Sequence, residues 1–288
     1  MASTPYRIAF LTAIHGNFHG LTAVLDAIRR DVPDLILLGG DFTYEFPYPR
    51  ETLELLDTVA YLAGRGNTDI SVTDWAVPGA WPDWLSADAI PHAHRTRAQI
   101  GDTWAARLAA LPLTRTLTVA GATGGAGEVL LMHGTPRDPF SGIHDTPNPD
   151  NIHPRWARPD DVVARHLAGI TARIILAGHT HVPLLRPWHG GTIVNPGAVA
   201  HSWHPTPNAH LARYALLTYR PGQEWAIALR AAPYDNAAAI RGLRELPAHN
   251  PRAERVAALI APPPVVVSRE SRVVRKSAGG DNLVSRDS

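Results

Sequence analysis

The sequence predicts an α/β fold in which helices cover a largely buried sheet on both faces. Two short apolar runs, at residues 7–12 and 35–38, are typical of strands and flank a helical stretch. Within that stretch, apolar side chains recur at the i, i+3, i+4 and i+7 spacing of one helical face, at Leu21, Val24, Leu25 and Ile28. Because apolar and polar residues do not alternate in these runs, we expect strands that are buried on both sides.

The later elements continue this alternation. Helices are predicted after Pro49 and at residues 99–110, 160–168 and 251–260. Strands are predicted at residues 116–120, 128–132, 173–177, 191–194, 214–219 and 225–229. The pattern predicts a single domain over residues 1–260 and a flexible tail at 261–288.

Two segments interrupt the regular pattern. Residues 71–110 form an excursion, which we expect to be loop-rich at 71–98 because prolines and tryptophans crowd together there. Residues 135–159 are rich in Pro, Asp, His and Asn, a composition typical of a long loop over a site.

Composition places the chain among folded globular proteins and disfavours several functions. Hydrophobic residues make up 45% of the 288 residues and charged residues 18%, which allows a sizeable core. Lys and Arg number 27 and Asp and Glu 26, so a net charge of +1 disfavours nucleic acid as a partner. The absence of cysteine excludes disulfides and zinc–thiolate sites. With no leader and no apolar run of about 18 residues, we expect a cytoplasmic protein without a membrane partner.

Metal-ligating residue types stand beside glycine in five loops that follow predicted strands and helices. They are His15, Asp41, Asn67, His133 and the pair His179 and His181. In an open α/β sheet, ligands bind at the edge where the carboxyl ends of the strands meet. Any one of these residues alone is best explained as a turn, a cap or a hydrogen-bonded structural residue. Five such loops in one chain favour a shared metal site.

The order of these motifs resembles the calcineurin-like metallophosphoesterase superfamily, and in particular its small bacterial phosphodiesterase branch. That family carries the series D-x-H, GD, GN, H and GH-x-H. The resemblance spans about residues 6–220 and includes HGTPRDP after the fourth motif, NPGAVA after the fifth and the later stretch NAHLARYALLTY. It implies an αββα sandwich of two mixed β-sheets flanked by helices.

The resemblance also implies two divalent metal ions about 3.5 Å apart. The ligands would be His15, Asp41 and His181 for the first ion and Asp41, Asn67, His133 and His179 for the second, with Asp41 bridging. Neutral imidazoles, an amide oxygen and a carboxylate suit manganese, which we favour, or iron, nickel and zinc, rather than calcium. A hydroxide between the ions would attack phosphorus in line with the leaving group. The implied catalytic residues are Asp41, Asn67, His133 and His179.

The first motif departs from the family pattern, because Ala13 stands where aspartate is expected. A methyl group cannot bind a metal, so the first site keeps three protein ligands rather than four. Two interpretations remain open: a substitution introduced to trap substrate or product, or a natural alanine in a protein whose first site is weak or absent. In both cases we expect reduced occupancy of the first site and low turnover.

The third motif reads GNTD, with Thr68 where many relatives carry a histidine that protonates the leaving group. Threonine is a poor general acid at neutral pH. The leaving group is therefore a good one, or another residue donates the proton. The candidates are His144, His201 and His204, although each is better explained as a solvent-exposed histidine.

Three further side chains, together with His144 and His201, are candidates for binding the substrate. Asn17 could hydrogen-bond a phosphate or cap the helix that follows it. Arg65 and Arg137 could clamp a phosphate through paired N–H groups or make surface ion pairs.

These features predict a dinuclear-metal-dependent phosphohydrolase, with phosphodiesterase activity on a small diester such as a nucleotide as the leading hypothesis. A diester with a good leaving group suits the GNTD motif, since it needs no strong general acid. Phosphomonoesterase activity is the alternative within the family. The other alternative is a non-catalytic protein-binding scaffold on the same fold, as in the retromer scaffold subunit, which Ala13 favours and the intact ligand loops oppose. A homo-oligomer is left open.

Overall fold

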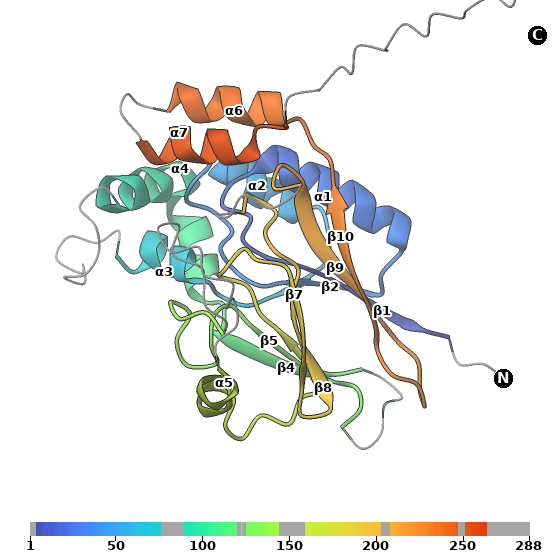
Figure 1. Cartoon of the computed structure of the whole chain (residues 1–288). Coiled ribbons are helices and arrows are strands. Elements are labelled where there is room, and N and C mark those ends of the chain that lie inside the picture. Colours follow the sequence, from blue (N-terminus) through green and yellow to red (C-terminus); the bar gives the residue numbers. More distant parts are fainter. Residues whose placement is uncertain are drawn as a thin grey trace, which may run out of the picture.

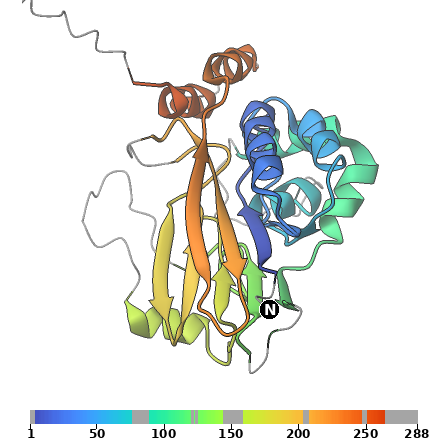
Figure 2. The ribbon, with the colours of Figure 1, turned by 90° about the vertical axis from the view of Figure 1, so that its right-hand side faces the viewer.

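A computed structural model describes residues 4–75, 89–119, 122, 125–143, 159–202, 208–246 and 251–263. Within these residues the chain forms two five-stranded sheets and seven helices (Figures 1 and 2). Most of the predicted tail, and residues 76–88 and 144–158 of the two interrupting segments, lie outside the described residues.

The first sheet is mixed and has the strand order β10-β9-β1-β2-β3. Its strands are β1 (Tyr6–Leu11), β2 (Leu35–Leu38), β3 (Leu62–Ala63), β9 (Ala212–Tyr219) and β10 (Ala226–Ala232). The connecting helices α1 (Phe18–Asp31) and α2 (Pro49–Leu56) allow β1, β2 and β3 to run parallel. The hairpin β9–β10 pairs antiparallel with β1.

The second sheet is also mixed and has the order β4-β5-β6-β8-β7. Its strands are β4 (Thr114–Thr118), β5 (Glu128–Met132), β6 (Ile174–Leu176), β7 (Leu184–Trp188) and β8 (Gly191–Asn195). β5, β6 and β8 run parallel, and the hairpins β4–β5 and β7–β8 add an antiparallel strand at each edge. Both sheets therefore contain parallel strands, and the loops after these strands carry the predicted ligands.

Alternation along the strands produces four layers. Ile8 of β1 and Leu131 of β5 pack between the two sheets, whereas Ala9 of β1 faces helices and Leu130 of β5 faces the opposite way. Helices α1, α2 and α4 (Ala89–Ala109) cover the outer face of the first sheet (Figure 2). Helix α5 (Asp160–His166) covers the outer face of the second. The predicted αββα sandwich of two mixed sheets is confirmed.

Helix α4 begins at Ala89, so the prediction of a loop is wrong for residues 89–98. Pro91 favours a loop, but it lies in the first helical turn, where its missing N–H costs nothing. The buried face of the first half of the helix consists of Ala89, His92, Ala93, Thr96 and Ile100. The helix bends at Gly101, whose φ of 77° is accessible to glycine at no steric cost.

Strands β3 and β7 and helices α3 (Asn67–Thr73) and α6 (Asn236–Glu245) are missing from the prediction. β7 contains Pro187, which disfavours a strand except at a sheet edge, where β7 lies. Helix α6 is rich in alanine, so its apolar period is faint; it packs with α7 (Pro251–Ile260) around Phe46 and Ala200 (Figure 1). Across the described ranges, no helix is both long and apolar enough to span a membrane.

Leu131→Ala is expected to lower the free energy of unfolding by about 2–5 kcal/mol, because it opens a cavity between the sheets where no solvent reaches. The Leu131 side chain is 0% exposed. Leu185→Ala on β7 is the matched control, since Leu185 is 43% exposed and should lose about 1 kcal/mol or less. Urea unfolding measures both. Equal losses would contradict the layering.

Candidate metal centre

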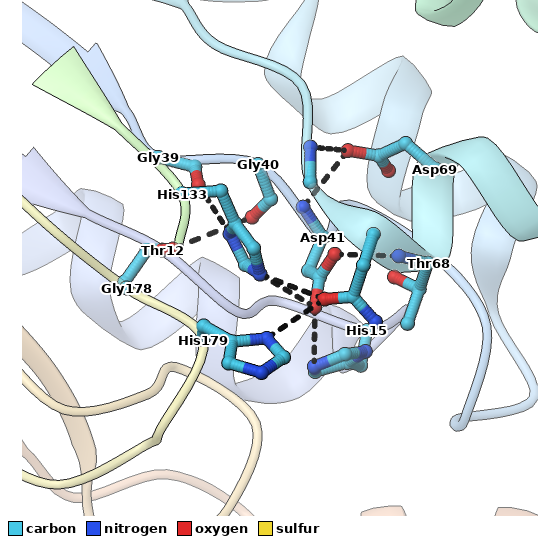
Figure 3. A network of polar contacts seen from close by, with 12 residues as sticks. Thr12, His15, Gly39, Gly40, Asp41, Thr68, Asp69, His133, Gly178 and His179 are labelled. Atoms are coloured by element: carbon cyan, nitrogen blue, oxygen red, sulfur yellow. Dashed lines mark hydrogen bonds and ion pairs between the residues drawn. The ribbon is translucent and has the colours of Figure 1, made fainter. Parts of the chain in front are cut away.

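The predicted ligands come from both sheets and meet in one buried or partly buried cluster, of which Figure 3 shows His15, Asp41, His133 and His179. They lie in the loops after β1, β2, β5 and β6 and at the first residue of α3 (Asn67–Thr73), and they are His15, Asp41, Asn67, His133, His179 and His181. The loops of the two sheets meet because the carboxyl ends of the parallel strands lie at the same end of the sandwich.

One oxygen lies at the centre of the cluster. Asp41 Oδ2 is 3.4 Å from His15 Nε2 and 3.2 Å from His133 Nε2, while Asp41 Oδ1 accepts a hydrogen bond of 2.8 Å from the Thr68 amide. Burial opposes ionisation, but His133, His15 and the Thr68 amide together hold the pKa of Asp41 well below its usual value. The carboxylate is therefore charged and can serve two cations at once.

On one side of Asp41, two imidazole nitrogens face each other. His15 Nε2 and His181 Nε2 are 3.0 Å apart, and both residues can place a ligand atom within 4.8 Å of the Asp41 carboxylate. His181 Nδ1 donates to the carbonyl of His201 at 2.8 Å, which leaves Nε2 with its lone pair when the ring is neutral. Burial, followed by the charge of His15, keeps the pKa of His181 well below its usual value. A cation between these nitrogens suits that arrangement.

On the other side of Asp41, acceptor atoms converge again. His133 Nε2 and His179 Nδ1 lie 3.0 and 2.9 Å from the same atom, Asn67 Oδ1. His133 Nδ1 donates to the Gly39 carbonyl at 2.7 Å, so its Nε2 is the atom free for a metal. Burial, followed by the charge of His133, lowers the pKa of His179 to about 4. This donor set fits a second divalent cation.

Asp69 is a structural member of the site that sequence reasoning missed. Its Oδ2 accepts from the amides of Asp41 and Gly66, and its Oδ1 accepts from the amide of Phe42, all at 2.9 Å. Asp69 is fully buried, and burial and the Asp41 charge raise the pKa of its carboxyl to about 7. The available signal was its place three residues after Gly66, where a carboxylate completes a capping box at the start of α3.

Two glycines let the Asp41 loop and the Asn67 loop touch. A Cβ at Gly66 would overlap the Asp41 carboxylate, and a Cβ at Gly40 would overlap the backbone of Gly66. Gly40 also has a φ of 86°. Glycine is therefore required at both positions for Asp41 and Asn67 to lie side by side.

Backbone strain is concentrated at the site. Nine non-glycine residues among those described have positive φ, and five belong to the ligand loops: Ala13, His15, Asp41, His179 and His181. Their φ angles lie between 51° and 66°. Each costs about 1–3 kcal/mol and persists only where the surrounding structure over-determines it. Strain of this kind is typical of active and ligand-binding sites.

Asn17, Arg65 and Arg137, three of the substrate-binding candidates, lie outside the cluster of ligands. Asn17 caps α1, with its Oδ1 accepting from the Gly20 amide at 2.9 Å. Arg65 pairs with Asp74 at 2.5 Å, and Arg137 is exposed. The structure thus brings none of these side chains into the cluster of acceptor atoms.

Of the three general-acid candidates, only His201 lies within the described residues. His144 and His204 lie outside the described residues. His201 is buried, with its ring centre 5.0 Å from that of His181, and burial lowers its pKa to about 4. Thr68 Oγ1 donates to the Thr43 carbonyl at 3.2 Å. Neither His201, which is neutral at pH 7, nor Thr68 is suited to protonate a strongly basic leaving group.

The chain is similar to known proteins in sequence and in fold. The chain matches the family model of the calcineurin-like phosphoesterases over residues 6–183. The crystal structure of a metallophosphoesterase from Sphaerobacter thermophilus is 24% identical, with a TM-score of 0.63 over 88% of this chain and 98% of that one. The hypothetical protein PH1004 from Pyrococcus horikoshii OT3 is 21% identical, with a TM-score of 0.66 over 88% of this chain and 97% of that one. Both share the fold, and no curated protein matches the chain.

Asp69→Asn is expected to destabilise the protein by about 1–3 kcal/mol, because an amide NH₂ cannot accept from the buried backbone N–H groups. The loosened Asp41 loop should also bind Mn²⁺ more weakly. Asp74→Asn, at the exposed C-terminal end of the same helix, is the control and should change stability by at most about 1 kcal/mol. Thermal unfolding with and without Mn²⁺ separates the two effects; wild-type stability in Asp69→Asn would refute this role.

Proposed function

Because the chain belongs to the calcineurin-like phosphoesterase family, we propose that it is a phosphodiesterase that depends on two metal ions sharing Asp41. The family depends on metal ions, and the buried His and Asp side chains described above offer a site for them. The observation that carries the proposal is the position of Asp41 Oδ2, which faces His15 Nε2 and His133 Nε2 at 3.4 and 3.2 Å.

The donor atoms fit divalent transition metals. His15, Asp41 and His181 would hold one ion, and Asp41, Asn67, His133 and His179 would hold the other. Imidazole nitrogens with one carboxylate and one amide oxygen suit manganese, iron, nickel or zinc. When bound, two such ions acidify a water molecule and polarise the phosphoryl oxygens. The chain's part is to hold the donor atoms in place and to keep His179 and His181 neutral by burial.

The surroundings favour a diester with a weakly basic leaving group. Thr68 occupies the place of the family's proton-donating histidine, and its hydroxyl is already engaged with the Thr43 carbonyl. His201 is neutral at pH 7 because burial lowers its pKa to about 4. A leaving group that departs without protonation therefore matches these residues better than an alkyl monoester does.

Turnover with Mn²⁺ tests the proposal. Hydrolysis of bis(p-nitrophenyl) phosphate should exceed that of p-nitrophenyl phosphate, and a chelator should abolish both. His179→Ala should lower kcat/KM at least about 10–100-fold, the loss typical of even outer metal-site partners. His189→Ala, an exposed histidine in the β7–β8 turn, should leave it unchanged. Faster hydrolysis of the monoester would favour a phosphomonoesterase. If neither ester is hydrolysed in a metal-dependent way, a binding scaffold would be favoured.

Ala13→Asp is expected to tighten binding of the ion at His15, Asp41 and His181 and to raise diesterase kcat. The change adds a carboxylate beside His15, and aspartate tolerates the φ of 52° at this position better than alanine does. Ala13→Asn is the control, since it shares the backbone tolerance but adds no charge. If both variants behave like the wild type in metal content and turnover, position 13 does not limit this site.

A further inference from the structure

Glu45 is a buried carboxylate that neither the motifs nor the ligand set above includes. It lies four residues after Asp41 and is 3% exposed. Its Oε1 accepts from Arg252 of α7, with the Arg252 Nε 3.0 Å away, and its Oε2 lies 3.3 Å from His201 Nδ1. Burial opposes the charge, but Arg252 above all, with His201, His15 and His181, keeps the pKa of Glu45 well below its usual value. The ion pair with Arg252 thus holds the buried carboxylate in its charged form.

The Glu45 loop is fastened to the first ligand loop. The amides of Glu45 and Phe46 both donate to the His15 carbonyl, at 3.1 and 2.8 Å. The ring centre of His201 lies 5.0 Å from that of His181 and 6.2 Å from that of His15. Glu45, His201, His15 and His181 thus form one continuous buried cluster on one side of Asp41.

The same cluster borders position 13. The Ala200 amide donates to the Ala13 carbonyl at 3.0 Å, and His201 follows Ala200 directly in the chain. Position 13 is therefore connected to Glu45 through Ala200 and His201.

Glu45 and His15 each have a buried polar atom without a hydrogen bond. Within the described part of the chain, Glu45 Oε2 accepts none and His15 Nδ1 makes none. A buried anion is stable only near positive charge, and Arg252 donates to Oε1. Oε2 lies 3.3 Å from His201 Nδ1, and a cation at His15, Asp41 and His181, beyond His201, would complete the balance of charge.

We propose that Glu45 supplies the negative charge that position 13 lacks, acting through His201 on the cation held by His15, Asp41 and His181. Glu45 is thus a positioning residue for that metal ion. Arg252 opposes this action, because it neutralises the same carboxylate from the other side. The inference rests on the proposed metal centre. It adds to that centre Glu45, from the loop that follows Asp41, and Arg252, from helix α7.

Isothermal titration of the full chain with Mn²⁺ tests this role without an activity assay. Glu45→Gln removes the charge at nearly constant shape and should raise the Kd of the weaker Mn²⁺ by about 10–100-fold, while the tighter ion is unaffected. Arg252→Gln should lower the weaker Kd. Glu254→Gln, on the same helix as Arg252 and 63% exposed at its side chain, should change neither value.

Position 13 provides the decisive cross-check. Ala13→Asp should restore the weaker Mn²⁺ in the Glu45→Gln background and should gain more there than in the wild type, because both carboxylates serve the same ion. The role is overturned if Glu45→Gln lowers only the melting temperature, or if Glu45→Gln and Arg252→Gln weaken Mn²⁺ binding alike, since an ion pair with a purely structural role predicts both. Absence of Mn²⁺ binding by the wild type and by Ala13→Asp would instead overturn the metal centre itself.

Discussion

The site depends on the Asp41 carboxylate. One of its oxygens faces imidazoles from both sheets, the other accepts from the Thr68 amide, and its own backbone amide is held by Asp69. A buried carboxylate without such partners is costly, so each contact is a condition for the others. Because His15 follows a strand of the first sheet and His133 a strand of the second, this single anion also couples the two halves of the sandwich.

The sandwich holds the ligand loops in conformations that isolated loops would not keep. Five ligand-loop residues have left-handed backbone angles at about 1–3 kcal/mol each. Burial of Ile8 and Leu131 between the sheets and of Ala9 against helices offsets this strain. At the position where the family pattern has an aspartate, Ala13 keeps the strained backbone without the carboxylate. The charge of Glu45 accounts for how a metal site can survive that loss.

The sequence was sufficient for the fold class and for the residues that the structure brings together, and insufficient for what supports them. Strand ends are marked by apolar runs and glycines, so His15, Asp41 and His133 could be placed at one edge. No local sequence signal identifies Glu45, because its role depends on an ion pair with Arg252 of α7, which lies 207 residues later in the chain. Asp69 acts only through backbone amides, which a side-chain motif does not reveal. The predicted helix starts at residue 99 rather than at Ala89, because Pro91 resembles a loop signal until its place in the first helical turn is known.

Anomalous scattering from a crystal of the wild-type chain soaked in Mn²⁺ tests the shared Asp41 most directly. The account predicts two peaks on opposite sides of Asp41, one bounded by His15 and His181 and the other by Asn67, His133 and His179, with the first peak the weaker. A single peak on one side of Asp41, or metal bound elsewhere with Asp41 uncoordinated, would contradict a centre built on that one carboxylate.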